Sequence, residues 1–365
     1  MKPVYLDWNA TAQIRPEVIA LVTRVMGEVG NASSVHDFGR RARKYVEDAR
    51  VQIAGLCHVT PEQVTFTGSA TESINTVHHG FKDKRVLISS IEHPAVIASA
   101  GERCEKIPVT RDGVIDMNAY QEMLKNPPAL VSVMLVNSET GVIQPIAEMA
   151  KMAHDVGALF HTDAVQGAGR IDISFDKLGV DFMSLSAHKF AGPQGVGAII
   201  KRDGLELPKF MLGGGQEKNC RAGTHNTAGI AGMGLAAEMA QKNISVYAEI
   251  EKMRDDMEQK IRQVSNTAII YGAGAPRVGN TTNVGLPGVP AQTQMMALDL
   301  DGVSVSSGSA CSSGSFKASH VLTAMGASEE EAKSALRISL GYATTQADID
   351  AFLESWEKIV KRTQT

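Results

Sequence analysis

Between residues 60 and 200 the chain alternates short apolar runs with segments of helical pattern, and this alternation restricts the possible folds most strongly. The apolar runs predict strands at 63–67, 85–89, 130–136, 158–162 and 182–185. The segments between them predict helices at 71–80, 94–100 and 146–156. Continuous apolar strands separated by helices are typical of a mostly parallel sheet that is covered on both faces. We therefore expect an α/β fold.

The pattern changes after Gly204, which indicates a second structural unit. A Gly-rich loop at 213–215 precedes one long predicted helix at 228–260, and Thr345 is the expected N-cap of a final helix. At 365 residues the chain exceeds one average core, so two domains are expected. We place a large domain at 15–245, and a smaller αβ domain at 1–14 together with 246–365.

Charge, hydropathy and cysteine usage exclude several classes of protein. The formal net charge of −4 argues against a nucleic-acid partner. No apolar run approaches the length of a membrane span, and the first residues do not resemble a signal peptide. Cys57, Cys104, Cys220 and Cys311 form no Cys-x-x-Cys pair, so neither a disulfide framework nor a zinc site is indicated. We expect a soluble, cytoplasmic protein with no membrane partner.

Two short polar runs, Asp163-Ala-Val-Gln166 and Ser186-Ala-His-Lys189, each close a predicted strand. The carboxyl ends of neighbouring parallel strands meet at the edge where open α/β sheets bind ligands. A lysine and a carboxylate at that edge are what pyridoxal 5'-phosphate requires, because the amine forms the Schiff base and the acid keeps the ring nitrogen protonated. The alternative is an ordinary strand-end acid and a solvated lysine. His161 shares a strand face with Asp163, but no third ligand has suitable spacing, so no metal site is predicted.

Two further features suit a phosphorylated, aromatic cofactor. The run Thr67-Gly-Ser-Ala-Thr-Glu72 joins a predicted strand to a helix, where backbone N–H groups and the helix dipole can bind a phosphate. Ser186 and His188 could add donors, although a plain helix cap explains the run equally well. His93 follows another predicted strand, where an imidazole could stack on a pyridine ring and move protons. An ordinary loop histidine is the alternative.

The C-terminal part contributes a cysteine and an arginine with unusual surroundings. Residues 306–315 contain only Ser, Gly, Ala and Cys311, a composition that cannot form a core. On such an exposed loop a thiolate can form and react, although a flexible linker with an incidental cysteine is possible. Arg337 lies in the otherwise apolar run 335–340, and an arginine in such a place usually binds a carboxylate.

Taken in order along the chain, these motifs resemble those of the cysteine desulfurases. The matching runs are Tyr5-Leu-Asp-x-Asn-Ala-Thr11, Gly30-Asn-x-Ser-Ser34, Ala70-Thr-Glu-Ser73, Glu92-His-Pro-Ala95, Asp163-Ala-x-Gln166, Ser186-x-His-Lys189, Arg221-x-Gly-Thr224 and Ser306-Ser-Gly-Ser-Ala-Cys311. The long Ser/Gly loop is similar to that of the iron–sulfur and nitrogen-fixation branch. The resemblance covers nearly the whole chain and implies a fold-type I pyridoxal phosphate enzyme.

The resemblance also implies a role for each matching residue. Lys189 would be the Schiff-base lysine, Asp163 the partner of the pyridinium nitrogen, His93 the stacking acid–base and Cys311 the sulfur acceptor. Gln166 would bond the phenolic oxygen of the cofactor. The other expected cofactor contacts are Ala70, Thr71, Ser138, Ser186, His188 and Thr224 of the partner subunit. The expected substrate contacts are Arg337, on the carboxylate, with Asn9 and Asn137.

The activity that the resemblance implies is conversion of L-cysteine to L-alanine. The sulfur would remain on Cys311 as a persulfide and then pass to an iron–sulfur scaffold or another acceptor protein, and the enzyme would be a homodimer. A related lyase or aminotransferase, such as a selenocysteine lyase, needs Lys189 and Asp163 but no persulfide-forming cysteine. A non-catalytic member that binds a partner is an alternative of a different class.

The chain departs from the family pattern at a few positions. Ser138 stands where an asparagine is common, Ala32 where a proline is usual and Ala12 where a threonine is usual. The sequence also stops soon after its last predicted helix, without the longer tail by which some relatives engage a scaffold protein. The first of these departures affects an expected cofactor contact.

Overall fold

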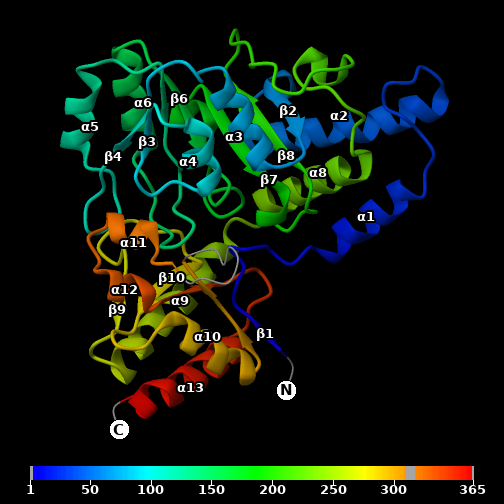
Figure 1. Cartoon of the computed structure of the whole chain (residues 1–365). Helices are drawn as coiled ribbons and strands as arrows, with labels where there is room; N and C mark the ends of the chain where they lie inside the picture. The colour runs from blue at the N-terminus through cyan, green and yellow to red at the C-terminus, as the bar shows by residue number, and fades with distance from the viewer. Residues whose placement is uncertain (1–2, 309–316, 364–365) are drawn as a thin grey trace.

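The computed structural model of the chain describes residues 3–308 and 317–363. Its largest feature is a seven-stranded sheet in the order β2-β8-β7-β6-β5-β3-β4, in the upper half of Figure 1. The strands are β2 Val64–Thr67, β3 Val86–Ser89, β4 Cys104–Ile107, β5 Leu130–Ser132, β6 Leu159–Asp163, β7 Phe182–Ser186 and β8 Gly197–Lys201. The neighbours from β4 to β7 are parallel, and β8 is antiparallel to both strands beside it. The predicted α/β fold with a mostly parallel sheet is confirmed.

Helices cover both faces of this sheet because successive strand residues point to opposite sides. Val86 and Ile88 pack with α3 (Ala70–His79) and α4 (Pro94–Ala100), whereas Leu87 between them packs into the core of the opposite face. The helices of that opposite face are α1 Pro16–Met26, α2 Asp37–Cys57, α5 Met117–Leu124, α6 Ile146–Asp155, α7 Phe175–Leu178 and α8 Thr227–Lys242. Short 3₁₀ turns are η1 Pro61–Gln63, η2 Ala187–Lys189 and η3 Gln216–Asn219.

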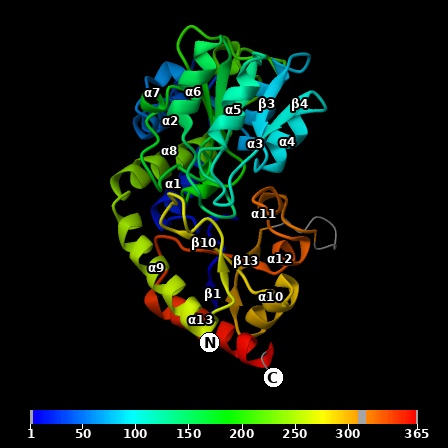
Figure 2. The same ribbon diagram turned by 90° about the vertical axis from the view of Figure 1, so that its left-hand side faces the viewer.

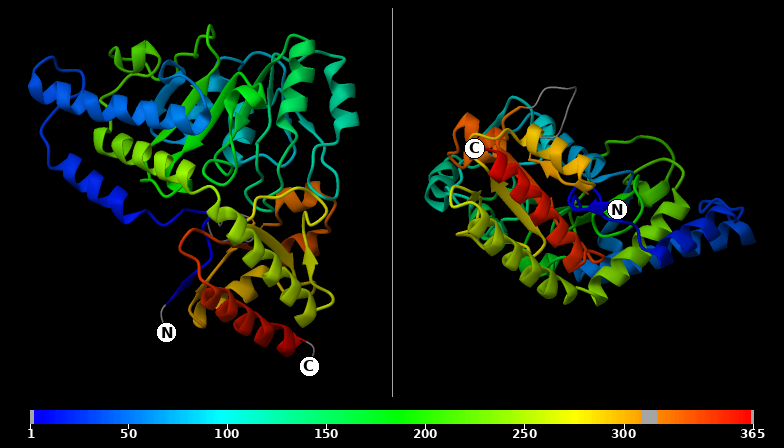
Figure 3. Two further views of the ribbon diagram at one scale, coloured as in Figure 1. Left: turned by 180° about the vertical axis from the view of Figure 1, so that it is seen from behind. Right: turned by 90° about the horizontal axis from the view of Figure 1, so that it is seen from below.

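A smaller αβ unit lies below the large sheet in Figures 1 and 2 and contains both termini. Its strands are β1 Val4–Tyr5, β9 Ile269–Ile270, β10 Thr281–Gly285, β11 Val303–Ser304, β12 Ser306–Ser307 and β13 Ala335–Ser339. Its helices are α9 Val246–Val264, α10 Ala291–Leu300, α11 His320–Ala324, α12 Glu329–Lys333 and α13 Gln346–Thr363. The amphipathic α9 and α13 pack side by side beneath β10 and β13, as the view from below in Figure 3 shows. Thr345 caps α13 together with Asp348, as predicted.

One predicted helix is wrong. The region 228–260 forms two helices, α8 and α9, which are separated at residues 243–245. Asn243 ends α8, because its backbone N–H and its side-chain Nδ2 both donate to the Met239 carbonyl, at 3.1 and 2.7 Å. A side-chain amide that competes for helix carbonyls in this way favours a helix end. The break allows α8 to cover the large sheet while α9 runs down the smaller unit.

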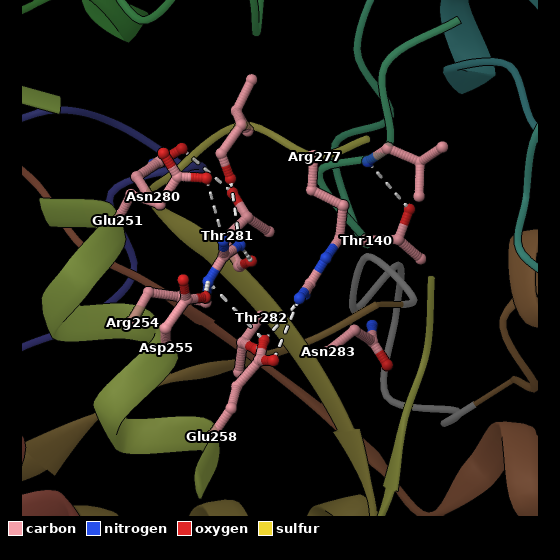
Figure 4. A network of polar contacts seen from close by, with 12 residues as sticks. Thr140, Glu251, Arg254, Asp255, Glu258, Arg277, Asn280, Thr281, Thr282 and Asn283 are labelled. Atoms are coloured by element: carbon pink, nitrogen blue, oxygen red, sulfur yellow. Dashed lines mark hydrogen bonds and ion pairs between the residues drawn. The ribbon is translucent and has the colours of Figure 1, made fainter. Parts of the chain in front are cut away.

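A buried polar network joins the smaller unit to the loop at 137–143 of the large one (Figure 4). Glu258 of α9 accepts two hydrogen bonds from Arg277, at 2.7 and 3.0 Å, and one from the Thr282 hydroxyl. Arg254, one turn earlier, donates to the carbonyls of Val278 and Thr281, both at 3.2 Å. The adjoining segment then bonds to the loop, with Val278 N–H donating to the Gly141 carbonyl at 2.9 Å. The network fixes the loop that carries Ser138.

Most apolar side chains cluster within one unit, and a further cluster joins Ile91 of the large unit to Tyr271 and Val321 of the smaller one. One cluster combines Leu6 with residues from 250 to 360, and two others line the faces of the large sheet. The domain division at residues 15 and 245 stays a prediction. Within the described ranges, no helix is long and apolar enough to cross a membrane, and no cluster of His, Cys, Asp and Glu side chains is suited to a metal ion.

Candidate active site

A cavity of about 680 Å³ lies between the large sheet and the smaller unit. Its floor is formed by the residues that follow β3, β5, β6 and β7, and its side by the start of α3. The smaller unit closes the opposite side with Ser306–Gly308, Lys317–His320 and Arg337. The cavity thus occupies the carboxyl edge of the parallel strands, where the sequence predicted a site. The predicted residues that line it are Asn9, Ala70, Thr71, His93, Ser138, Asp163, Gln166, Ser186, His188, Lys189 and Arg337.

Lys189 extends into this cavity from the turn after β7. Its Nζ donates to the backbone carbonyls of Asn9 at 2.6 Å and Ala10 at 2.7 Å. Burial, followed by the positive charges of Arg170 and Arg337, lowers the pKa of Lys189 to about 7. A lysine amine that is about half uncharged at neutral pH is a competent nucleophile and base.

Asp163 and His93 lie close enough to Lys189 for their charges to interact. Burial raises the pKa of Asp163, and one carboxylate oxygen accepts from Val165 N–H at 3.0 Å. Burial also lowers the pKa of His93, whose Nδ1 accepts from Ala95 N–H at the start of α4. A buried acid with a raised pKa is stabilised as its anion by a cationic partner, which here would be a protonated ring nitrogen.

The turn before α3 has the form of a phosphate cradle. Ser69 caps the helix by accepting from Glu72 N–H, and Ala70 and Thr71 lie at the positive end of the helix dipole. Gly197 of β8 passes directly beneath, and a Cβ there would lie 2.7 Å from the Ser69 carbonyl carbon. Only a glycine therefore permits this approach. His188 faces the same region, and burial lowers its pKa to about 4, so its ring is neutral.

The wall formed by the smaller unit carries Arg337 in β13. Its guanidinium donates to Asp7 at 2.7 Å and to the Ser138 carbonyl at 3.2 Å, while its buried Nε has no partner in the described part of the chain. An arginine held on two sides with one donor free is prepared for a carboxylate ligand. The prediction of a carboxylate-binding arginine thus fits the geometry.

The two predicted asparagines are used inside the protein. Asn9 donates to the Ser138 carbonyl and to the Thr281 hydroxyl, and its oxygen accepts from Asn280. The hydrogen bond that Asn9 makes with Lys189 therefore involves its backbone carbonyl and not its side chain. Asn137 is fully buried and does not line the cavity. Its oxygen accepts from Glu139 N–H and Thr140 N–H, which shapes the loop, so the predicted direct substrate contact of Asn137 does not fit this structure.

Two predicted residues lie elsewhere. Thr224 is exposed and does not line the cavity of its own chain. Its loop is nevertheless fixed beside the phosphate cradle, because Arg221 Nε donates to Glu72 at 2.8 Å. Cys311 lies outside the described residues, between the segments Ser306–Gly308 and Lys317–His320 that border the cavity.

The chain matches known proteins over its whole length. The family model for class V aminotransferases matches residues 4–352. The cysteine desulfurase IscS of Dictyoglomus turgidum is 38% identical over all of this chain and 96% of its own length. A solved structure of a NifS-like protein from Rickettsia africae has a TM-score of 0.93 and 38% identity, and covers 98% of this chain and 99% of its own. Another, titled SspA in complex with cysteine, has a TM-score of 0.79 and 30% identity, and covers 92% and 98%.

The chain belongs to the class V aminotransferase family. Within it, the chain groups with the pyridoxal-phosphate-dependent cysteine desulfurases, as its motifs indicated. The predicted fold type and cofactor are thereby confirmed.

The residues of the cavity fit this cofactor. A reactive lysine, a buried acid and a helix N-terminus approached only by a glycine match its aldehyde, ring nitrogen and phosphate. Lys189, Asp163 and Gln166 would hold the ring, while Thr71, Ser186 and His188 would hold the phosphate. When bound, the group supplies an electron sink for the substrate's α-carbon.

Sequence reasoning missed several polar residues of the site. Glu92 is buried, and its Oε1 accepts from Ser89 at 2.5 Å and from Met134 N–H at 2.8 Å. Burial raises the pKa of Glu92 to about 8 and that of Glu139, which accepts from Ser319 at 2.6 Å, to about 7. Glu92 lies within a quoted motif and Glu139 follows Ser138, but only the packed structure reveals that both acids are buried. Gly197 and Arg170 gave no motif signal at all.

Proposed function

We propose that this chain transfers the sulfur of L-cysteine to Cys311 and releases L-alanine. The observation that carries the proposal is the placement of Lys189, Asp163 and Arg337 in one cavity bordered by the two segments that flank Cys311. The relative determined in complex with cysteine supports the choice of substrate. The uncharged lysine, the buried acid and the free arginine donor each match one requirement of an amino-acid substrate bound through pyridoxal phosphate.

Each residue has a defined task in this proposal. Arg337 binds the substrate carboxylate, and Lys189 removes the α-proton because its amine is uncharged above about pH 7. His93, which lines the same cavity near Lys189, would hold and return protons. The Cys311 thiolate then attacks the substrate sulfur, so that an S–S bond forms while the C–S bond breaks. The electron pair of that bond stays on carbon, which takes up a proton to become the methyl group of alanine.

The decisive experiment compares the native chain with Cys311→Ser. The serine variant should bind pyridoxal phosphate and L-cysteine normally, yet carry no persulfide and release little alanine. Persulfide on the tryptic peptide that contains Cys311 is measured by mass spectrometry, with Cys220→Ser as the matched control on another thiol. If the Cys311→Ser variant produces alanine at the native rate, a lyase of the selenocysteine type becomes the better assignment.

We propose further that the working enzyme is a cytoplasmic homodimer that passes its persulfide sulfur to an iron–sulfur scaffold or another acceptor protein. Large apolar side chains are exposed on the α1–α2 arm and on the 210–212 loop; they are Met26, Val29, Val35, Phe38, Phe210, Met211 and Leu212. Such a concentration of exposed apolar residues favours a covered interface. The same loop leads to Thr224, which would then reach the phosphate bound by its partner.

Mixed dimers test the shared site. Lys189→Ala removes the covalent attachment, and Thr224→Asp sets a carboxylate against the phosphate, so each homodimer should be nearly inactive. In a mixed dimer, one pocket combines a native Lys189 with a native Thr224 and should recover up to about half of the native activity. If Thr224 serves its own chain, both pockets stay defective. Absence of recovery in verified mixed dimers would refute the shared site.

A further inference from the structure

Arg170 is a buried cation behind the lysine site, and the known family motifs give it no role. It is 4% exposed, and the main influences on its pKa are burial, a hydrogen bond and charge interaction with Tyr247, and repulsion by Arg337, with no carboxylate of the described residues among them. Its Nε has no hydrogen-bond partner in residues 3–308 and 317–363. A buried guanidinium without an acid is costly in free energy, so its presence here requires a compensating role.

The contacts of Arg170 lead directly to Lys189. Its Nη1 donates to the carbonyl of Gln166 at 3.2 Å and also to the side-chain oxygen of Gln166. Gln166 Nε2 then donates to the Asn9 carbonyl at 3.0 Å, the same oxygen that accepts from Lys189 Nζ at 2.6 Å. Because a guanidinium has donors only, it fixes the amide oxygen of Gln166 toward itself and the amide nitrogen toward the cavity.

The charge of Arg170 acts on the same lysine. After burial, Arg170 is the largest contributor to the lowered pKa of Lys189, ahead of Arg337, while Asp7 and Asp163 oppose the shift. The rings of His93 and His188 also face Lys189. Since burial of Arg170 excludes water, solvent screens the interaction between its charge and Lys189 only weakly.

We propose that Arg170 is a positioning residue for the lysine site: it orients the Gln166 amide and places a permanent positive charge behind Lys189. The benefit to the cofactor rests on the proposed function, because the amide nitrogen of Gln166 would face its phenolic oxygen. The hydrogen bonds from Arg170 to Gln166 and on to Asn9, and the charge of Arg170, are present in the protein without the cofactor.

Competitive labelling tests the charge without the cofactor. The full chain, freed of pyridoxal phosphate, is labelled with trace acetic anhydride across a pH series, and the peptide containing Lys189 is quantified by mass spectrometry. The native midpoint should lie at about pH 7. In Arg170→Met the midpoint should rise by about one unit, so labelling at pH 7 should fall about fivefold. Arg170→Gln, which keeps a polar group but no charge, should behave in the same way.

The matched control is Arg254→Met, since Arg254 is 3% exposed but pairs with acids of α9. It should destabilise the chain and leave the Lys189 midpoint unchanged. An unchanged midpoint in a folded Arg170→Met or Arg170→Gln chain overturns the electrostatic role. If the variants show the shift but the native chain has no desulfurase activity, the proposed function alone is refuted.

Arg170→Lys separates orientation from charge. It should keep the native midpoint, because the charge remains, but weaken binding of pyridoxal phosphate about fivefold, because one ammonium cannot hold the amide as the guanidinium does. Native affinity in this variant overturns the orienting role. If neither uncharged variant folds, this variant also decides the electrostatic role, since a raised midpoint despite the retained charge contradicts it.

Discussion

The two walls of the cavity differ in how completely the protein satisfies their polar groups. On the wall formed by the smaller unit, Asn9 has its side-chain amide bonded within the chain, and Arg337 is held by Asp7. On the sheet wall, the acid Asp163 has a raised pKa and the base Lys189 a lowered one. Most polar groups of the first wall are bonded before any ligand arrives, with Arg337 Nε left for a ligand, whereas the second wall has ionisable groups whose charged forms are disfavoured by burial. A group that binds the sheet wall therefore gains electrostatic energy that the chain has left available.

Removing Lys189 should have the largest effect, because no other group on the sheet wall can form the covalent bond. Lys189→Ala should lower activity by about a thousandfold or more. After borohydride reduction, the native chain should carry pyridoxyl on the Lys189 peptide, and the variant should carry none. Reduced cofactor on a different lysine of the native chain would show that Lys189 does not form the covalent bond.

Breaking the network of Figure 4 should have the next largest effect, on stability. Glu258 is 3% exposed, so Glu258→Gln leaves Arg277 without its anion and removes one of the three acids near Arg254, which should cost about 3–5 kcal/mol. Urea unfolding measures the loss. The matched control on the same helix is Glu249→Gln, whose partner Lys252 is exposed, and it should change stability by less than about 0.5 kcal/mol. Equal losses would show that the network is no stronger than a surface pair.

Arg337 should matter for substrate far more than for cofactor. Arg337→Met removes a charged hydrogen-bond donor from the substrate carboxylate and should lower kcat/KM for L-cysteine about 30- to 100-fold, equivalent to about 2–3 kcal/mol. Equilibrium titration should give an affinity for pyridoxal phosphate close to the native value. An equal loss of cofactor affinity would show that Arg337 contributes to cofactor binding as well as to substrate binding.

Glu92 makes the stability of the sheet wall depend on pH. Its pKa is raised from 4.5 to about 8 on folding, so the folded chain holds this proton more tightly than the unfolded chain. The contribution of Glu92 protonation to the free energy of unfolding is fully present below about pH 4.5 and is lost as the pH rises through 8. Glu92→Gln should remove this loss, and its stability relative to the native chain should increase by about 1.4 kcal/mol per unit between pH 5 and 8. If thermal unfolding of the native chain and of Glu92→Gln depends on pH in the same way, Glu92 does not have the raised pKa that its burial implies.

Ser138 should show the smallest effect, since its contact with the smaller unit is made by its backbone carbonyl. Ser138→Asn should be tolerated, and Ser138→Ala should change cofactor affinity by no more than one hydrogen bond, about 0.5–1.5 kcal/mol. Binding titrations of the two variants measure this. Loss of activity in Ser138→Asn would show that the loop has diverged from that of relatives with asparagine.

The sequence permitted prediction of the strand ends and of most cavity residues, because parallel strands bring their carboxyl ends together whatever the details of packing. It could not reveal how side-chain bonds are used: Asn137 carries a family motif, yet its amide is consumed inside its own loop. The break between α8 and α9 was missed because Asn243 ends the helix through its side chain, without a proline or glycine. Arg170 lies between small and apolar residues, Gly169 and Ile171, outside any quoted motif, and becomes significant only through its contact with Gln166.

The pairing of β1 with β11 has a consequence for synthesis on the ribosome. Val4 pairs with Val303, and the segment that follows supplies the Asn9 and Ala10 carbonyls that hold Lys189. At roughly 5–20 residues per second, the first strand waits about 15–60 s for its partner to be translated. The large sheet has all its strands by Lys201 and can form in that interval. The turn that forms the phosphate cradle can therefore fold before the C-terminal segment with Arg337 is available to close the cavity.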